Sequence, residues 1–317
     1  MGELHLVTAH ELHILPDRDA VRRKLRQPRV LLREQRLFHL IQRPYQLRSQ
    51  PEYLLPYLRL TRCRRMFVEN VKELRDWGPI LDKDTTHKGR LYKAGTADPR
   101  KKGIFFNLWY REIKASGYNV EMEVLNAADY GAATSRERLI VQAVRKSSGD
   151  RIVWPEPTHM REPGLLSGSY RPWHSAAEII DWSIPGESIF DRKKPLCTNT
   201  LRRIEAGIRK YWGAWAEPFI VEYYGQGGAV PLNIPLHTVT TKDRFGVVEG
   251  RVLTLSDGRS FKLGITHRML TARELAAATS FPENYVFCGG DTAAKKQIGN
   301  AVPPVLAEAL YRAVLAA

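Results

Sequence analysis

The chain has 317 residues, of which 43% are hydrophobic and 26% charged, a globular composition with room for one large domain or for a catalytic domain with a smaller attachment. No run of about 18 apolar residues occurs and the first residues lack a secretory signal pattern, so we expect a cytoplasmic protein with no membrane span. Three scattered cysteines are too few for a disulfide framework or a zinc cluster, so we expect no metal site. The net charge of +15 indicates a polyanionic partner, most commonly nucleic acid.

The first part of the chain, residues 1–65, is an atypical arginine-rich segment. Residues 1–66 hold 13 arginines and one lysine against six acids, a net charge of +8, and they contain one glycine against 22 in the rest. Their apolar residues keep neither a strand period nor a sustained helix period. We therefore predict that this segment is poorly ordered or loosely helical and supplies no strand to a sheet.

The next part, residues 66–154, alternates between strand and helix patterns. MFVENV predicts a buried parallel strand that delivers polar side chains at its carboxyl end. A charged surface loop follows at 82–102, then a helix that stops at Gly117, and then strands in NVEMEVLN and RLIVQAVR. Strands and helices in this order predict an α/β sheet.

Two further regions complete the chain. Residues 155–262 are rich in Pro, Gly, Trp and Tyr and contain short alternating segments, which predicts a small, mostly β domain. Residues 263–317 return to helix patterns, including one that starts at Pro303-Pro304, where proline is well tolerated.

Several separated segments carry a resemblance to a known family. They are 67–71 (FVENV), 129–131 (DYG) with 135–138 (SRER), 268–274 (RMLTARE) running to 280–282 (SFP), 297–304 (QIGNAVPP), and 238–244 (TVTTKDR). Each is weak alone, but they occur in one order over roughly residues 66–317. Together they resemble the DNA cytosine-5 methyltransferases, in particular those of phages and bacteria.

The resemblance implies a fold and a chemistry. The fold would be a Rossmann-like α/β sheet of the S-adenosylmethionine-dependent methyltransferases, incomplete at its N-terminal half, with a small target-recognition domain. In this family a cysteine thiolate adds to C6 of a flipped cytosine and so activates C5. The resemblance places Glu69 at N3 and the exocyclic amine, and Arg138 at O2, while Arg136 braces the loop or the backbone.

The same resemblance assigns the cofactor and the DNA contacts. Asn300, with Ala301 and Val302, would lie against the methionine part of S-adenosylmethionine. The partner would be double-stranded DNA, with Lys242 and Arg244 as contacts to phosphates or bases, although a solvated turn explains these two cations about as well.

Two family motifs are missing from the sequence. No Phe-x-Gly-x-Gly loop precedes the Glu-Asn-Val segment, and no Pro-Cys dipeptide occurs anywhere in the chain. Cys63 lies six residues before Glu69, and we interpret it as an incidental cysteine rather than a nucleophile. Four interpretations remain open: a degraded or truncated enzyme, one subunit of a split methyltransferase, a non-catalytic DNA-binding relative, and an RNA cytosine methyltransferase.

Overall fold

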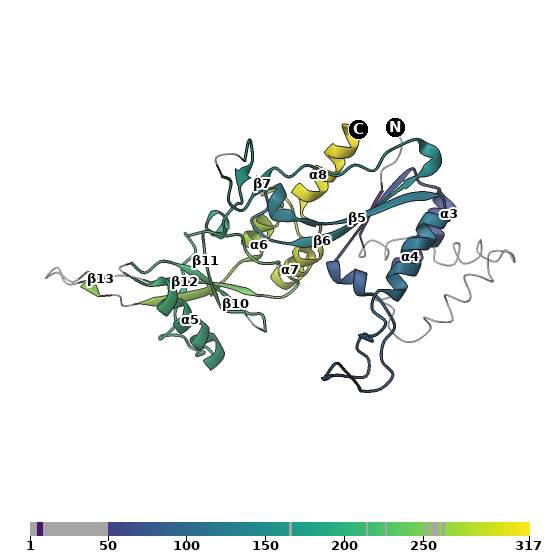
Figure 1. Ribbon diagram of the computed structural model, residues 1–317. Helices are drawn as coiled ribbons and strands as arrows, with labels where there is room; N and C mark the ends of the chain where they lie inside the picture. Colours follow the sequence, from purple (N-terminus) through teal and green to yellow (C-terminus); the bar gives the residue numbers. More distant parts are fainter. Residues whose placement is uncertain are drawn as a thin grey trace. The chain divides into compact units, whose positions relative to one another are not determined.

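The computed structural model describes residues 5–8, 50–164, 167–213, 215–225, 227–250, 253–254, 260–261 and 264–317 (Figure 1). The chain divides into two compact units. Unit 1 takes Met1–Leu125 and Arg138–Val153 with Ala317, and unit 2 takes Asn126–Glu137 and Trp154–Ala316. Among the described residues, no helix is both long and apolar enough to cross a membrane.

Unit 1 is built on a four-stranded sheet of order β1-β2-β6-β5. Its strands are β1 (His5–Thr8), β2 (Arg65–Asn70), β5 (Tyr118–Asn126) and β6 (Glu137–Arg145). Strand β2 runs parallel to β1 and antiparallel to β6. The predicted buried strand at MFVENV is therefore confirmed in the centre of an α/β sheet.

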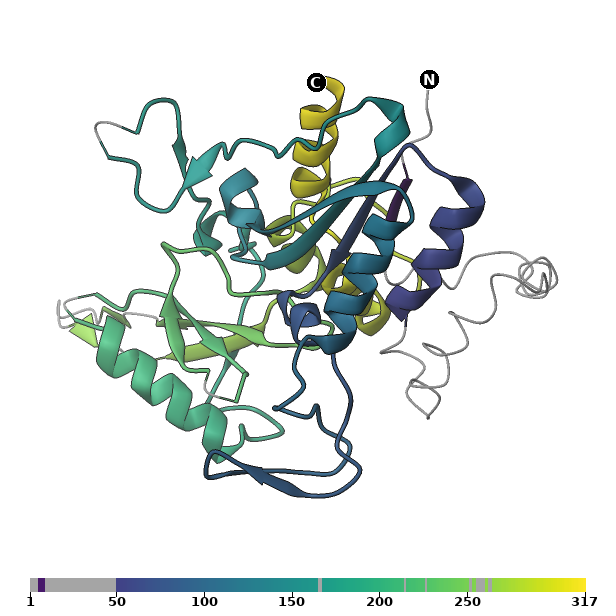
Figure 2. The same cartoon turned by 45° about the vertical axis from the view of Figure 1, so that its right-hand side comes forward.

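Two helices, α3 (Leu54–Thr61) and α4 (Ile104–Ala115), cover one face of this sheet (Figure 2). Because side chains alternate along a strand, Met66 and Val68 of β2 face the helices, as do Leu139 and Val141 of β6. The predicted helix end is also confirmed, because Gly117 follows the α4 cap with a left-handed φ of 94°. The opposite face of the sheet carries the odd-numbered residues of β2.

The arginine-rich segment contains a strand that we did not expect, besides helical residues. Strand β1 supplies a strand from residues 5–8, and residues Gln50–Tyr53 (η2) and α3 are helical. The expectation of no strand is wrong there, because HLVT finds a parallel partner in β2 far along the chain. The rest of that expectation concerns residues 1–4 and 9–49, which lie outside the described residues.

The predicted loop at 82–102 also holds a hairpin. After the short helix η3 (Lys72–Asp76), strands β3 (Thr85–His87) and β4 (Arg90–Tyr92) pair antiparallel. The short helix η5 (Lys146–Ser148) follows β6 in the same unit.

Unit 2 is built on a five-stranded sheet of order β11-β10-β12-β15-β9. These strands are β9 (Glu187–Ser188), β10 (Phe219–Glu222), β11 (Ala229–Pro231), β12 (Phe245–Gly250) and β15 (Ile265–Met269). Around them lie several short elements: η4 (Ala127–Tyr130), β7 (His159–Met160), β8 (Arg171–Pro172), η6 (Ala176–Ile179), β13 (Leu253–Thr254) and β14 (Ser260–Phe261). The longer helices are α5 (Thr198–Tyr211), α6 (Ala272–Ala278), α7 (Asp291–Asn300) and α8 (Pro304–Leu315).

The unit boundaries differ from those that the sequence indicated. Strand β15, after residue 262, pairs with β12, before it, so the predicted recognition region and the C-terminal segment share one sheet. Residues 126–137, which we placed with the catalytic sheet, belong to unit 2. Shared burial explains the difference, because the core of unit 2 combines Ile220 and Val247 with Leu275 and Ile298.

Candidate active site

In unit 1, Glu69 and Arg138 form a buried ion pair on the face of the sheet opposite α3 and α4. Arg138 Nε lies 2.7 Å from Glu69 Oε1, and the two side chains are 10% and 8% exposed. Antiparallel register places Glu69 across from Ile140, so Arg138 is its diagonal neighbour on the same face. The structure thus brings together two of the residues that the sequence singled out.

Burial sets the electrostatics of this pair. Burial of the guanidinium lowers the pKa of Arg138, while the carboxylates of Glu69 and Glu73 act in the opposite direction. An arginine remains charged at neutral pH even so. The pair therefore presents an acceptor and a fixed cation side by side, a pattern that complements the amide-like edge of a nucleobase.

Arg136 belongs to unit 2 and braces its backbone. The side chain is 1% exposed, with Nη1 donating to the carbonyl of Val239 at 2.5 Å and Nη2 to the carbonyl of Gly299 at 2.8 Å. One guanidinium thus joins three of the segments that carried the resemblance. Its burial supports a positioning role.

The expected cofactor residues lie at the end of α7. Asn300 is exposed, and Ala301 and Val302 are half-buried. The preceding Gly299 packs so closely on a neighbouring loop that a Cβ there would lie 2.3 Å from the carbonyl carbon of Thr240. This close approach explains the glycine and fixes the start of the turn that holds the three residues.

The described residues do not form a complete site for S-adenosylmethionine. After Gly2 the next glycine in the sequence is Gly78, so no glycine loop lies between β1 and β2. The glycine cluster at 225–228 lies between strands β10 and β11 and not at the start of a helix. The glycine loop that would cradle this cofactor is therefore missing from the described residues.

The two predicted DNA contacts have different surroundings. Lys242 is exposed, whereas Arg244 donates from Nη1 to the carbonyl of Tyr223 and lies 5.8 Å from the ring centre of Tyr224. The guanidinium of Arg244 is thus already engaged inside unit 2. Of the two, Lys242 is the one whose cation is turned to solvent.

The sequence analysis missed Lys295, which holds the loop that carries Lys242. Its side chain is 8% exposed, and Nζ lies 2.6 Å from Asp243 and 2.9 Å from Asp291. The spacing of Asp291 and Lys295, four residues apart, is a helical ion-pair signal that was available in the sequence. The contact with Asp243 requires the fold.

Cys63, the one cysteine of unit 1, is buried away from solvent. Cys63 is 9% exposed and packs in the core of unit 1, where Tyr118 Oη donates to its carbonyl at 3.0 Å. Cys197 and Cys288 are exposed and belong to unit 2. The interpretation of Cys63 as an incidental residue agrees with this burial.

The chain is similar to known DNA methyltransferases. The family model described as "C-5 cytosine-specific DNA methylase" matches residues 97–316. The type II methyltransferase M1.HphI of Haemophilus parahaemolyticus is 28% identical over 220 residues, covering 64% of this chain and 50% of the relative. The type II methyltransferase M.BspRI of Lysinibacillus sphaericus is 30% identical over 227 residues, covering 67% and 47%.

A solved structure, the methyltransferase EhMeth of Entamoeba histolytica, gives a TM-score of 0.45 at 11% identity, covering 84% of this chain and 68% of that chain. The chain spans about half the length of the curated relatives that it matches. The family match includes Arg136, Arg138, Lys242, Arg244 and Asn300, while Glu69 precedes it.

Proposed function

Since the chain belongs to the family of C-5 cytosine-specific DNA methylases, we propose that it binds double-stranded DNA and holds a flipped cytosine for methylation at C5, with S-adenosylmethionine as the methyl donor. The observation that carries this proposal is the buried pair of Glu69 and Arg138, 2.7 Å apart on adjacent strands. Because DNA is the proposed partner, a cytoplasmic location remains our expectation.

The chemistry of cytosine gives each member of the pair a role. A ring that accepts a nucleophile at C6 gains negative charge at N3 and O2. In the proposed complex the carboxyl group of Glu69 binds N3 and the exocyclic amine, and the guanidinium of Arg138 binds O2. The base must leave the helical stack to reach them, because C5 and C6 are covered inside a duplex.

We further propose that the nucleophilic thiol and the cofactor loop come from polypeptide outside these 317 residues. The sequence has no Pro-Cys dipeptide, and Cys63 is enclosed in the core of unit 1. A second subunit that carries both motifs would complete the site. The competing proposal, DNA binding without methyl transfer, draws support from the same buried Cys63.

Binding of single-stranded oligonucleotides tests the cytosine site without knowledge of the target sequence. We expect the chain to bind (dC)20 about tenfold more tightly than (dT)20, because thymine presents a donor at N3 and an acceptor at C4. Glu69→Ala should abolish the preference, and Glu123→Ala, which removes an exposed carboxylate from β5 of the same unit, should keep it. Equal affinity of the unaltered chain for both oligonucleotides would refute the cytosine site.

Transfer of labelled methyl from S-adenosylmethionine to duplex DNA then tests the missing motifs. The chain alone should incorporate no label, and addition of a separately expressed segment of a relative that carries the Pro-Cys and glycine-loop motifs should restore incorporation that Glu69→Ala abolishes. Incorporation by the chain alone would show a nucleophile among its own residues. No incorporation with the added segment would favour DNA binding without transfer.

A further inference from the structure

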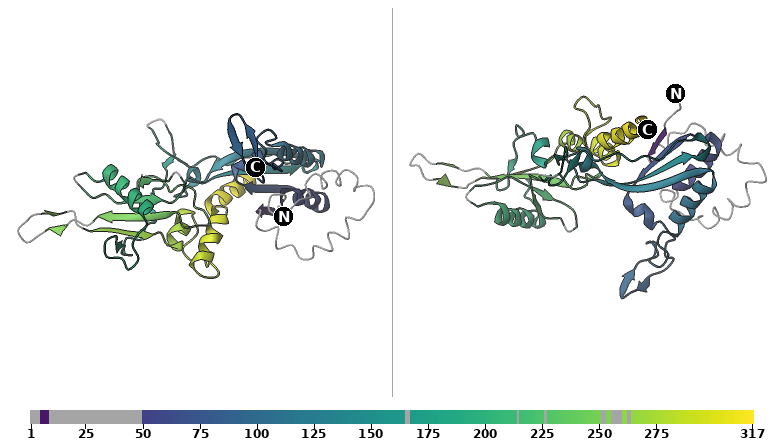
Figure 3. Two further views of the ribbon diagram at one scale, coloured as in Figure 1. Left: turned by 90° about the horizontal axis from the view of Figure 1, so that it is seen from below. Right: turned by 45° about the horizontal axis from the view of Figure 1, so that its top comes forward.

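The β3–β4 hairpin projects from unit 1 on the chain that leaves the Glu69 end of β2 (Figures 1 and 3). Its base is fixed by three backbone hydrogen bonds: Leu81 N to Thr96 O at 2.9 Å, Gly95 N to Leu81 O at 2.8 Å, and Asp98 N to Pro79 O at 2.8 Å. Leu81 is 6% exposed, so the base is also packed. The base of the hairpin is therefore anchored to unit 1 by hydrogen bonds and packing.

The far end of the hairpin has no core of its own. Its turn is formed by Lys88 and Gly89, both left-handed, with φ values of 47° and 73°, as a two-residue turn of type I′ requires. Leu91 is 55% exposed, and the neighbouring Arg90 is exposed as well. None of the strand residues of this ribbon is fully buried, so the ribbon gains little stability from burial, and burial does not explain why it projects from unit 1.

The hairpin and its flanking residues are rich in positive charge. Residues 82–102 contain seven lysines or arginines and three aspartates, a net charge of +4 over 21 residues. Ion pairs engage three of the cations: Lys93 with Asp84, Arg100 with Asp98, and Lys102 with Asp76. Within the described part of the chain, the other four have no carboxylate within ion-pair distance: Lys83, Lys88, Arg90 and Lys101.

We propose that the β3–β4 hairpin is a second DNA-binding element, in which Lys83, Lys88 and Arg90 contact phosphates of the duplex that flanks the target base. At about 3.3 Å per extended residue, the segment from Ile80 to Lys88, which contains β3, reaches at most ~26 Å from the base of the hairpin. A ribbon of two strands fits the major groove, which is about 12 Å wide. The proposal rests on the proposed function, since it names double-stranded DNA as the partner.

The expected energetics are those of phosphate contacts. Each cation that neutralises a phosphate releases a counterion, so the affinity should fall steeply with salt and carry little sequence preference. These contacts belong to unit 1, whereas the exposed Lys242 belongs to unit 2. They would add affinity without altering the recognition of cytosine by Glu69.

Charge reversal in the full chain tests the hairpin. We expect Lys88→Glu with Arg90→Glu to weaken binding to a 30-base-pair duplex of arbitrary sequence by about tenfold or more, and to reduce the slope of log Kd against log salt by about 2. The matched control is Arg111→Glu with Lys146→Glu, which makes the same charge change at two exposed cations of unit 1 outside the hairpin. Circular dichroism should show both variants folded.

The outcomes separate this proposal from the proposed function. Unchanged duplex affinity and salt slope in the hairpin variant, or an equal loss in the control, would overturn the hairpin proposal while the (dC)20 preference still tests Glu69. The same measurement with a 30-base-pair RNA duplex gives a further check. If the hairpin variant lost affinity for the RNA duplex but kept its affinity for the DNA duplex, the proposal would be overturned too. Loss of duplex DNA binding with the (dC)20 preference retained would support it.

Discussion

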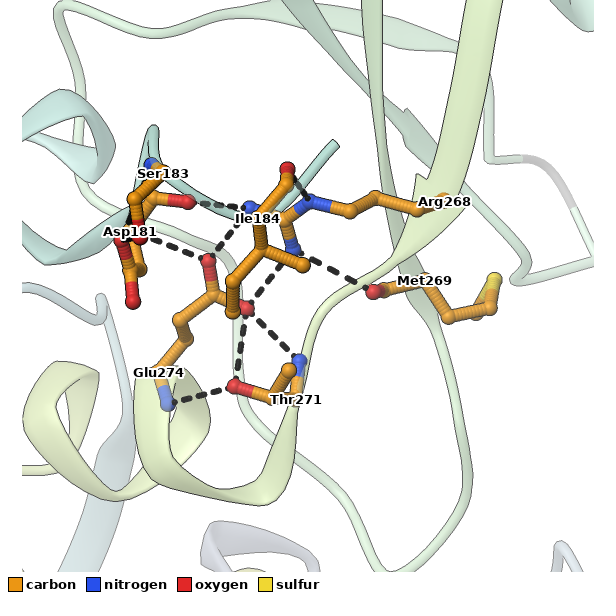
Figure 4. A network of polar contacts seen from close by, with 7 residues as sticks. All are labelled: Asp181, Ser183, Ile184, Arg268, Met269, Thr271 and Glu274. Carbon is orange, nitrogen blue, oxygen red and sulfur yellow. Dashed lines mark hydrogen bonds and ion pairs between the residues drawn. The ribbon is translucent and has the colours of Figure 1, made fainter. Parts of the chain in front are cut away.

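Arg268 and Glu274 form a buried two-point ion pair in unit 2, with Nη2 2.8 Å from Oε1 and Nη1 2.9 Å from Oε2 (Figure 4). The side chains are only 9% and 3% exposed. Glu274 also accepts from the backbone N–H groups of Thr271 and Asp181, and Arg268 donates to the carbonyls of Asp181 and Ile184. The pair therefore ties the end of β15 to the first turn of α6 and to the 181–184 loop.

Breaking this pair on one side should be costly. We expect Glu274→Leu alone, or Arg268→Met alone, to lower the free energy of unfolding by about 3–5 kcal/mol, because each leaves a buried group without its counter-charge. The double variant should lose less than the sum of the two. Denaturant unfolding measures all three.

An exposed pair provides the comparison. Arg209 and Glu205 lie 2.7 Å apart on α5, with side chains 78% and 60% exposed, so Arg209→Ala should cost under about 1 kcal/mol. Equal losses at the buried and exposed arginines would contradict the role that we assign to burial.

Gly299→Ala should disrupt the contact of α7 with its neighbouring loop. A Cβ at this position would lie 2.3 Å from the carbonyl carbon of Thr240 and 2.4 Å from the backbone nitrogen of Thr241, and backbone cannot move aside as a flexible side chain can. We expect a loss of at least about 2 kcal/mol of stability, read from thermal or denaturant unfolding. Gly228→Ala, where nothing lies within 4 Å, is the matched control and should be nearly neutral.

Acidification should destabilise the chain through His267. Burial, and to a smaller degree the nearby Arg192, lowers the pKa of His267 to about 4. As the pH falls below 6.5, the histidine becomes protonated in the unfolded chain but stays neutral in the folded chain. The contribution of neutral His267 to the free energy of unfolding is therefore complete above pH 6.5 and is lost as the pH falls toward 4. The total loss is about 3 kcal/mol. His267→Gln should flatten the decline in unfolding free energy between pH 7 and pH 4.5.

His237 supplies a control of opposite sign. Its hydrogen bond to Glu222 raises its pKa, so its contribution is present at low pH and fades as the pH rises through the raised value. His237→Gln should therefore steepen the acid decline that His267→Gln flattens. Identical pH profiles for the two variants and the unaltered chain would disprove both assignments.

Thiol labelling should distinguish the three cysteines. Cys197 and Cys288 are exposed and should react with iodoacetamide in the native protein, while the buried Cys63 should react only on unfolding. Hydrogen bonds from Thr200 lower the pKa of Cys197, so it should react at a lower pH than free cysteine in solution. Peptide mass spectrometry measures the labelling at each cysteine. Rapid labelling of Cys63 in the native protein would make it a candidate nucleophile again.

Many elements could be predicted from the sequence because their signals are local. Gly117 marks the end of helix α4 in the sequence, and Thr271 with Glu274 forms the capping box that begins α6. Strand β6 was visible as an apolar run. Strand β1 was missed because its partner β2 lies about 60 residues away, beyond the reach of any periodicity.

The candidate site divides in the same way. The motif resemblance singled out Glu69 and Arg138 by sequence, yet only the antiparallel register of β2 and β6 places them 2.7 Å apart. Arg244 looked as available as Lys242, and only the fold brings the carbonyl of Tyr223 to its guanidinium. Whether a cation is buried against a partner inside the protein depends on residues that are distant in the sequence.

By itself, then, the sequence determined the α/β class, most of the local elements, the positive charge and the family resemblance, because composition, helix and strand periods and caps act within a few residues of one another. The tertiary structure decided which charges pair, which remain in solvent and where the units divide. Strand register and helix packing make those choices, and they join residues far apart in the chain, as Arg136 joins Gly299, 163 positions away.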